Sequence, residues 1–177
     1  MDSGINVMKY EIVHAAEEDR EEVLQLYKAQ LGRAFCLWDE EYPGNGTIDF
    51  DLERDSLFIM KIDGRIAACI SVEDDEDVDN LPCWDKALAP GGELARLAVL
   101  PELQNRGIAR IMLQYGMEEL KKRGFRSVHF LVGRENVKAV RSYSHFGFHK
   151  AGECFMYGHE YLCYEKELSK QTGADSR

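Results

Sequence analysis

No uninterrupted apolar run in this 177-residue sequence approaches the roughly 18–20 residues that a membrane-spanning helix requires. The first residues, Met1 to Lys9, also lack the charged segment followed by an apolar segment that marks a secretory signal peptide. From these two absences we expect a cytoplasmic protein that has no membrane partner.

The cysteines and histidines form no recognisable disulfide or metal-binding pattern. None of the five cysteines belongs to a C-x-x-C pair, and an odd, scattered count is typical of reduced thiols. His145 and His149 are four residues apart, but Gly147 interrupts the helix that brings such a pair onto one face. We therefore expect no metal site.

Positive charge is in short supply as well. The chain has 22 Lys and Arg against 32 Asp and Glu, which gives a formal net charge of −10. An acidic chain is repelled by a phosphate backbone, so we expect no nucleic-acid partner. The acidic excess lies in residues 1–100, and its densest run, 73–79, is typical of an exposed, solvated loop.

What the sequence does contain is the composition of a globular domain, with 45% hydrophobic and 31% charged residues. We expect one domain over 10–168, between an N-terminal extension, 1–9, and a polar tail, 169–177. Residue spacing predicts strands over 10–15, 57–62, 65–72, 93–99, 127–132, 150–157 and 160–168. It predicts helices over 17–31, 107–123 and 135–146, and a short helix among loops within 33–56.

Two glycine-containing dipeptides predict hairpin turns. Asp63-Gly64 accepts the positive φ angles of a type I′ turn, and Gly158-His159 stands between the last two strands. The strand 93–99, the helix 107–123 and the strand 127–132 form one βαβ crossover. The element order therefore predicts an α/β fold with a mixed sheet and a central crossover.

The start of the helix after strand 93–99 has the features of an anion-binding turn. A helix N-terminus exposes unpaired N–H groups and a partial positive charge. Gly107 and Ala109 allow close approach, while Arg106 and Arg110 add cationic side chains. The segment matches neither a P-loop nor a G-x-G-x-x-G fingerprint. By itself, the pattern fits an ordinary strand-to-helix turn equally well.

Two longer blocks resemble a known family. The run LAVLPELQNRGIAR, residues 97–110, is similar to the acetyl-CoA signature [QR]-x-x-G-x-[GA] of the GNAT superfamily of N-acetyltransferases. The run NVKAVRSY, residues 136–143, followed by FGF at 146–148, is similar to the family's second block. The resemblance covers about residues 10–168. It implies a single-domain GNAT fold, with a mixed, mostly antiparallel sheet flanked by helices.

The resemblance implies acetyl-CoA as cosubstrate and assigns its contacts. Main-chain groups of the strand pair with the pantetheine arm, amides of the turn hold the diphosphate, and the second block lines the other side. The coenzyme-binding residues so implied are Leu97, Ala98, Val99, Gln104, Asn105, Arg106, Gly107, Ile108, Ala109, Arg110, Asn136, Ala139 and Tyr143. Helical spacing independently places the last three on one face.

The implied reaction is acetyl transfer to a primary amine by direct attack in a ternary complex. An alkylammonium has a pKa near 10.4, so the enzyme needs a base or a proton-conducting water chain. Glu93 is the candidate base, with an ion pair to Arg96 or a surface lysine as the alternative. A backbone N–H near Leu97 can stabilise the oxyanion. Tyr143 can protonate the leaving thiolate, with a packed aromatic as the alternative.

Aromatic residues and acids near the expected acceptor side suit a cationic amine through cation–π and ion-pair contacts. The candidate acceptor-binding residues are Trp38, Tyr42, Trp84 and Arg96. Residues such as Trp38 and Tyr42 more often belong to the core than to a pocket. Arg96 instead suits an acceptor carboxylate, which indicates an amino acid or a peptide end. The acceptor class, a small cationic amine, an amino acid or a peptide amine, stays open.

Other functions are compatible with the same residues. A non-catalytic acyl-CoA sensor on the same fold is the main alternative, because fold does not fix function. An ATP-dependent module lacks its P-loop lysine. A ping-pong route through Cys154 or Cys163 lacks a histidine at a defensible spacing. The resemblance also makes a homodimer plausible.

Overall fold

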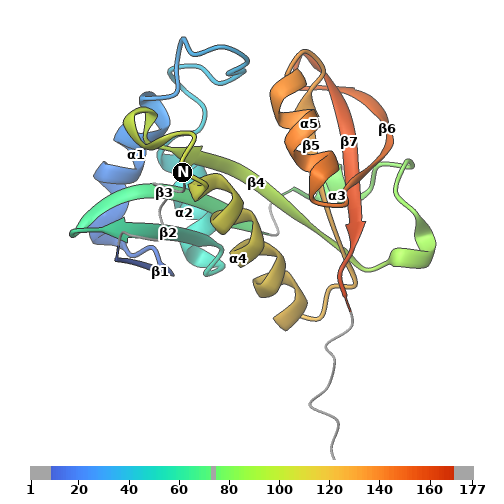
Figure 1. The fold of residues 1–177 in the computed structure, drawn as a ribbon, viewed down its shortest axis with the longest axis horizontal. Helices are drawn as coiled ribbons and strands as arrows, with labels where there is room; N and C mark the ends of the chain where they lie inside the picture. The colour runs from blue at the N-terminus through green and yellow to red at the C-terminus, as the bar shows by residue number, and fades with distance from the viewer. Residues whose placement is uncertain (1–8, 73–74, 170–177) are drawn as a thin grey trace, which may run out of the picture. The chain divides into compact units, whose positions relative to one another are not determined.

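The computed structural model describes residues 9–72 and 75–169 of the chain (Figure 1). Its strands are β1 (Tyr10–His14), β2 (Leu57–Ile62), β3 (Arg65–Val72), β4 (Gly91–Val99), β5 (Ser127–Gly133), β6 (His149–Met156) and β7 (His159–Glu167). Its α-helices are α1 (Arg20–Lys28), α2 (Asn45–Glu53), α3 (Glu76–Asp79), α4 (Ile108–Lys122) and α5 (Val137–His145). Short 3₁₀ turns lie at Glu17–Asp19, Lys86–Leu88 and Pro101–Leu103.

The strands form one sheet in the order β1-β2-β3-β4-β5-β7-β6. Only β4 and β5 pair in parallel, and α4 connects them, so the predicted βαβ crossover is confirmed. All other neighbours pair antiparallel. The predicted fold class, a mixed and mostly antiparallel sheet flanked by helices, is confirmed.

The described residues fall into two compact units, which are described separately below. The first contains 9–72 and 94–116, and the second contains 75–93 and 117–169. β4 and α4 therefore each contribute residues to both units. Apart from Lys9 and Ser169, the predicted N-terminal extension and C-terminal tail lie outside the described residues.

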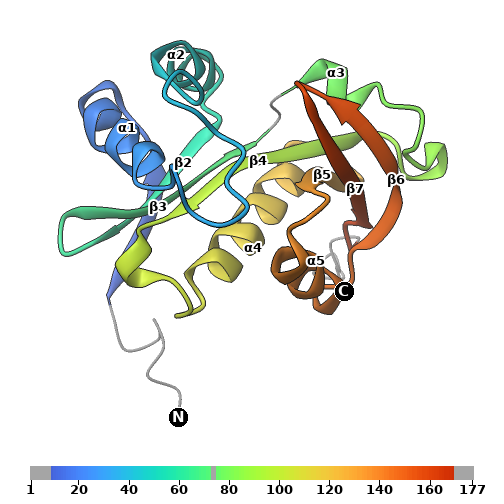
Figure 2. The same ribbon diagram turned by 90° about the horizontal axis from the view of Figure 1, so that it is seen from above.

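The first unit buries both faces of an antiparallel sheet, β1 to β3 with the second part of β4. Because successive strand residues point to opposite faces, β2 serves two cores. Leu57 and Ile59 pack with Val23 of α1 and Ile48 of α2, whereas the Phe58 ring packs against Tyr115 of α4. α1 and α2 thus cover one face and the first half of α4 covers the other (Figure 2). Burying each such side chain stabilises the fold by about 1.5–3 kcal/mol.

The second unit uses β5 in the same two-sided way. Phe130 packs against Tyr143 of α5, with ring centroids 4.3 Å apart, and against Phe148 at 4.8 Å. The alternate residue His129 points to the opposite face, where Trp84 stacks on it at 4.5 Å. α5 therefore covers one face of β5, while the segment after α3 covers the other.

The two predicted hairpin turns and the predicted acidic loop can be compared with the structure. The Asp63-Gly64 turn is confirmed, with φ values of 52° and 78°. In the last hairpin the positive φ angles fall on Tyr157 and Gly158, one residue before the predicted pair. The run 73–79 is not a simple solvated loop: it contains α3, whose Val78 is buried. Glu73 and Asp74 lie outside the described residues.

No helix among residues 9–72 and 75–169 is both long enough and apolar enough to cross a membrane. All five cysteines, Cys36, Cys69, Cys83, Cys154 and Cys163, are free thiols.

Candidate active site

β4 changes its hydrogen-bonded partner part-way along its length. Gly91 to Glu93 pair with β5, and Leu94 to Val99 pair with β3. Between Ala95 and Ala98 the β3 register shifts by one residue, and Arg96 has a φ of 49°. These are the features of a β-bulge, which bends the strand and redirects its backbone groups.

Leu97 and Val99 turn their main-chain groups away from β3. The Leu100 N–H donates to the Ala67 carbonyl at 2.9 Å, so Leu100 faces β3. In a strand, the N–H and C=O of one residue point to the same side, and those of the next residue point to the opposite side. The main-chain groups of Val99 and Leu97 therefore face away from β3. The Val99 carbonyl accepts instead from Nε2 of Gln30, at 2.9 Å.

The turn before α4 is exposed except for one anchoring residue. Ile108 is buried in the core, whereas Asn105, Arg106, Gly107, Ala109 and Arg110 are exposed. Gly107 has a φ of 84°, and a Cβ added there meets no protein atom within 4 Å. Glycine suits this position because the backbone is left-handed, and not because a neighbouring atom would collide with a Cβ. The first amides of α4 lie on this exposed surface, as an anion site requires.

The Gln104 side chain is held in place by two partners. Its Oε1 accepts from Nη2 of Arg33, and its Nε2 donates to the Val99 carbonyl at 3.5 Å. The sequence analysis did not select Arg33 or Gln30. Gln30 follows Val23 and Tyr27 on the buried face of the helical segment, which is the one sequence signal that identifies it as internal.

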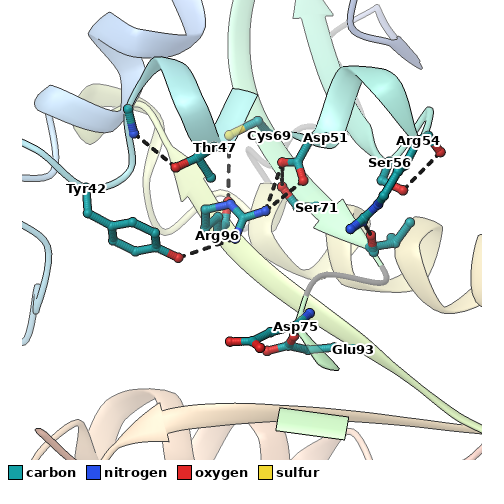
Figure 3. A network of polar contacts seen from close by, with 12 residues as sticks. Tyr42, Thr47, Asp51, Arg54, Ser56, Cys69, Ser71, Asp75, Glu93 and Arg96 are labelled. Carbon is teal, nitrogen blue, oxygen red and sulfur yellow. Dashed lines mark hydrogen bonds and ion pairs between the residues drawn. The ribbon is translucent and has the colours of Figure 1, made fainter. Parts of the chain in front are cut away.

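Arg96 forms a buried ion pair with Asp51 of α2 (Figure 3). Its Nη2 donates to Oδ1 and Oδ2 of Asp51 at 2.8 and 2.9 Å, and Ser71 donates to Oδ2 at 2.6 Å. Asp51 is fully buried, and Arg96 is 7% exposed. The predicted role of Arg96 as an anchor for an acceptor carboxylate is opposed by this pairing, because an internal carboxylate already balances its charge.

Tyr42 and Trp38 have different environments. The Tyr42 side chain is 47% exposed, and its hydroxyl accepts from Nη1 of Arg96 at 3.3 Å. Trp38 packs against the core cluster, edge-on to the Tyr27 ring at 5.6 Å. The structure therefore favours the core interpretation for Trp38 and an exposed phenol for Tyr42.

Glu93 is the last β4 residue that pairs with β5, and it is almost completely buried. Its Oε2 accepts from the Asp75 N–H at 2.9 Å (Figure 3). The Asp75 carboxylate accepts from the hydroxyl of Tyr157, at the tip of the last hairpin. The alternative role of Glu93, an ion pair to Arg96 or to a surface lysine, stays a prediction.

Glu93 belongs to a cross-strand row of buried titratable residues, which we call the Glu–His–Glu row: Glu93, His129 and Glu165. The segment 75–88 covers this row. His129 Nε2 lies 2.6 Å from Oδ1 of Asp79, and Glu165 accepts from the Asp85 N–H at 3.1 Å. These contacts explain why the acidic run is held against the sheet.

Trp84, predicted to line the acceptor site, is part of this cover. Its ring stacks on His129, and its Nε1 donates to the Val78 carbonyl at 2.7 Å. Both the ring face and the N–H are therefore used within the second unit. No sequence pattern revealed this arrangement, because Trp84 and His129 are far apart in the chain.

α5 places Asn136, Ala139 and Tyr143 on one helical surface. Asn136 is the N-cap residue, and its Oδ1 accepts from the Ala139 N–H at 3.1 Å. Its amide nitrogen is thus directed by a cap that the sequence analysis did not foresee. Burial raises the pKa of Tyr143 to about 12. Among the described residues, the Tyr143 hydroxyl has no hydrogen-bond partner.

Comparison with known proteins places this arrangement in a family. The model of the Acetyltransferase (GNAT) family matches residues 16–148, which include both the turn and α5. The chain belongs to the GNAT acetyltransferase family. The resemblance found in residues 97–110 and 136–143 is therefore confirmed at the level of the family.

Curated GNAT relatives match at moderate identity. A mycothiol acetyltransferase of Cellulomonas flavigena is 36% identical over 73 residues, which cover 40% of this chain and 21% of the relative. An uncharacterized N-acetyltransferase of Methanocaldococcus jannaschii is 26% identical over 147 residues, which cover 81% of this chain and 62% of the relative. The chain thus spans less than two thirds of the length of these relatives.

Solved GNAT structures share the fold. The ribosomal-protein-S18-alanine N-acetyltransferase of Escherichia coli has a TM-score of 0.68 and 21% identity, covering 96% of this chain and 99% of that one. A putative acetyltransferase of Salmonella typhimurium, solved with acetyl-CoA, has a TM-score of 0.67 and 15% identity, covering 96% and 99%. These likenesses show the architecture.

Proposed function

We propose that this protein transfers an acetyl group from acetyl-CoA to a primary amine in a ternary complex. The observation that carries the proposal is the exposed turn before α4. Gly107 is left-handed, Ile108 fixes the helix to the core, and the residues on either side of Ile108 are exposed. Such a turn suits a diphosphate, which is doubly anionic and accepts several hydrogen bonds.

Within each unit, further residues support binding of the rest of the coenzyme. Leu97 and Val99 turn main-chain groups away from β3, as an added strand-like pantetheine arm requires. Asn136 keeps its amide N–H groups for a ligand because its oxygen is used by the cap. Ala139, one turn along on the same helical surface as Tyr143, carries only a methyl group.

The chemical step forms a C–N bond and breaks the C–S bond of the thioester. The acceptor ammonium first loses a proton towards Glu93, directly or through water, because only the free amine is nucleophilic. The amine nitrogen then attacks the thioester carbonyl carbon. A backbone N–H near Leu97 stabilises the oxyanion. The products are the amide, free CoA thiol and one proton.

Tyr143 assists departure of the thiolate. With a pKa of about 12 the phenol stays protonated throughout the neutral range, so it is always able to donate. A phenol of raised pKa gives up its proton reluctantly, which favours a hydrogen bond to the thiolate over complete transfer. A cysteine nucleophile is disfavoured for a related reason: burial raises the pKa of Cys163 well above its ordinary value.

The acceptor is a cationic amine, an amino acid or a peptide amine. Asp75, Tyr157 and Glu93 are linked by hydrogen bonds, which supports recognition of an ammonium group near the base. The exposed Tyr42 phenol is a second candidate contact. The internal pairing of Arg96 with Asp51 argues against a carboxylate anchor there. Among the proteins compared, two are named for mycothiol and one for ribosomal protein S18 alanine.

Release of free CoA from acetyl-CoA, measured over a panel of polyamines, aminoglycosides, amino acids and peptides, tests the proposal. We expect release with at least one class, and loss of release in Tyr143→Phe with coenzyme binding retained. Binding of acetyl-CoA without release over the whole panel would favour the non-catalytic sensor instead. A thermal shift with ATP and none with acetyl-CoA would contradict both.

A further inference from the structure

Arg33, in the segment that follows α1, is attached by its side chain to the turn before α4. Its Nη2 donates to Oε1 of Gln104, the first residue of the signature. Gln104 donates from Nε2 to the Val99 carbonyl, to which Gln30 also donates. The Arg33 guanidinium is therefore held beside both parts of the first unit that the proposed function assigns to the coenzyme.

The support behind Arg33 is buried. Gln30 is only 9% exposed, and its Nε2 bridges the Leu26 carbonyl of α1, at 3.2 Å, and the Val99 carbonyl of β4, at 2.9 Å. The Arg33 N–H bonds to the Gln30 carbonyl at 3.2 Å. The backbone of Arg33 is thus fixed to the core while its side chain is exposed, an arrangement that preorganises a cation for a ligand.

The charges around the turn favour an anion. Residues 101–110 contain Arg106, Arg110 and one acid, Glu102, which forms an ion pair with Arg65 at 2.9 Å. Within residues 9–72 and 75–169, no carboxylate lies within ion-pair distance of Arg33. The Arg33 charge therefore has no internal carboxylate to balance it.

We propose that Arg33 is a phosphate ligand of the bound coenzyme, adding a side-chain contact to the main-chain contacts of the turn. Gln104 uses one N–H of the guanidinium and leaves others for phosphate oxygens. The planar fork of arginine suits two oxygens of one phosphate, which a lysine does not reproduce. This inference rests on the proposed function, because it concerns the same coenzyme.

The test compares Arg33→Ala and Arg33→Lys with the wild-type protein by calorimetric titration of CoA and of 3′-dephospho-CoA. We expect Arg33→Ala to raise the Kd for CoA about tenfold, as loss of a partly exposed charge-assisted hydrogen bond does. We expect an intermediate Kd for Arg33→Lys. If acetyl transfer occurs, KM for acetyl-CoA rises while kcat at saturation is unchanged.

Lys28→Ala is the matched control, because Lys28 is an exposed cation at the end of α1, five residues before Arg33. It removes the same charge, and we expect its Kd to stay within about twofold of the wild type. An equal loss of CoA affinity in both alanine variants would overturn the proposal. Such a result would indicate long-range electrostatic attraction rather than a direct contact. Unchanged binding in Arg33→Ala would overturn it as well.

The two coenzymes locate the contact. If Arg33→Ala weakens the binding of CoA and 3′-dephospho-CoA equally, Arg33 contacts the diphosphate. If it weakens the binding of CoA alone, Arg33 contacts the 3′-phosphate. Either result supports a phosphate contact. A wild-type protein that binds neither coenzyme refutes the proposed function itself. Wild-type binding that Arg33→Ala leaves intact refutes only the role of Arg33.

Discussion

Asp51 and Arg96 meet in the interior of the first unit, where both carboxylate oxygens accept from one guanidinium nitrogen at 2.8 and 2.9 Å. Asp51 lies on α2 and Arg96 at the β4 bulge, so this pair fixes the helix to the point where the strand bends. The bulge precedes Leu97, whose main chain the proposed mechanism uses. The ion pair therefore links the stability of the fold to the geometry of the site.

Asp51→Asn is expected to lower the free energy of unfolding by about 3 kcal/mol, because the buried Arg96 guanidinium loses the carboxylate charge that pairs with it. Urea denaturation with an unchanged m-value measures the loss. Arg65→Ala is the comparison, since the Arg65–Glu102 pair is exposed and its removal should leave the urea midpoint nearly unchanged. Equal losses in the two variants would contradict a special role for the buried pair.

Gly107→Ala is expected to lower the free energy of unfolding by about 1–2 kcal/mol, because alanine at a φ of 84° is strained. Gly46→Ala, in the first turn of α2, is the control: its added Cβ also meets no atom within 4 Å, and its φ is not in the left-handed region. We expect that variant to be neutral or slightly stabilised. Two similar urea midpoints would show that the turn tolerates a side chain.

Glu93→Gln is expected to reduce kcat by about 10²-fold, while the hydrogen bond from the Asp75 N–H to the side-chain oxygen is kept. Glu165→Gln is matched to it, because Glu165 is equally buried and accepts from the Asp85 N–H. Steady-state rates of CoA release are the measurement, and we expect the control to stay within about twofold of the wild type. A comparable fall in both variants would indicate that the Glu–His–Glu row is structural.

Alkaline pH is expected to unfold the wild-type protein more readily than Tyr143→Phe. Burial raises the pKa of Tyr143 from its ordinary value of 10 to about 12, so the folded state retains a proton that the unfolded state loses. The stabilisation from the neutral phenol is complete below about pH 10 and disappears as the pH rises to about 12, a change of about 2 kcal/mol.

Urea denaturation at pH 8, 10 and 11 measures the effect as the difference in slope between wild type and Tyr143→Phe. Tyr10→Phe, which removes a phenol that is 41% exposed, is the control for the loss of a hydroxyl group as such. Cys69, whose pKa burial also raises to about 12, contributes equally to all three proteins and cancels. Identical slopes in wild type and Tyr143→Phe would show that the phenol ionises freely.

Features that depend on neighbouring residues were predicted correctly. Asp63-Gly64 specifies its hairpin turn because the required φ angles are a property of that dipeptide. The β4-α4-β5 crossover follows from apolar periodicity and from the handedness of such units. The glycine-containing turn before α4 also lies within a short segment. Local spacing was therefore sufficient for the hairpin turn and the crossover, whereas the coenzyme contacts stay a prediction.

Features that depend on distant residues were missed or given another role. Nothing in the sequence distinguishes Asp51 from the many surface acids, and only α2 packing over the β4 bulge brings it to Arg96. Trp84 and the acidic run pack over the Glu–His–Glu row. They do so because the side chains of this row, on three neighbouring strands, form hydrogen bonds with the segment 75–88. The sequence alone determined which chemical groups are present and the local conformation of the segments that carry them. Tertiary packing decided which charges neutralise each other and which stay available to a ligand, because an ion pair between residues far apart in the chain exists only after their elements are folded together.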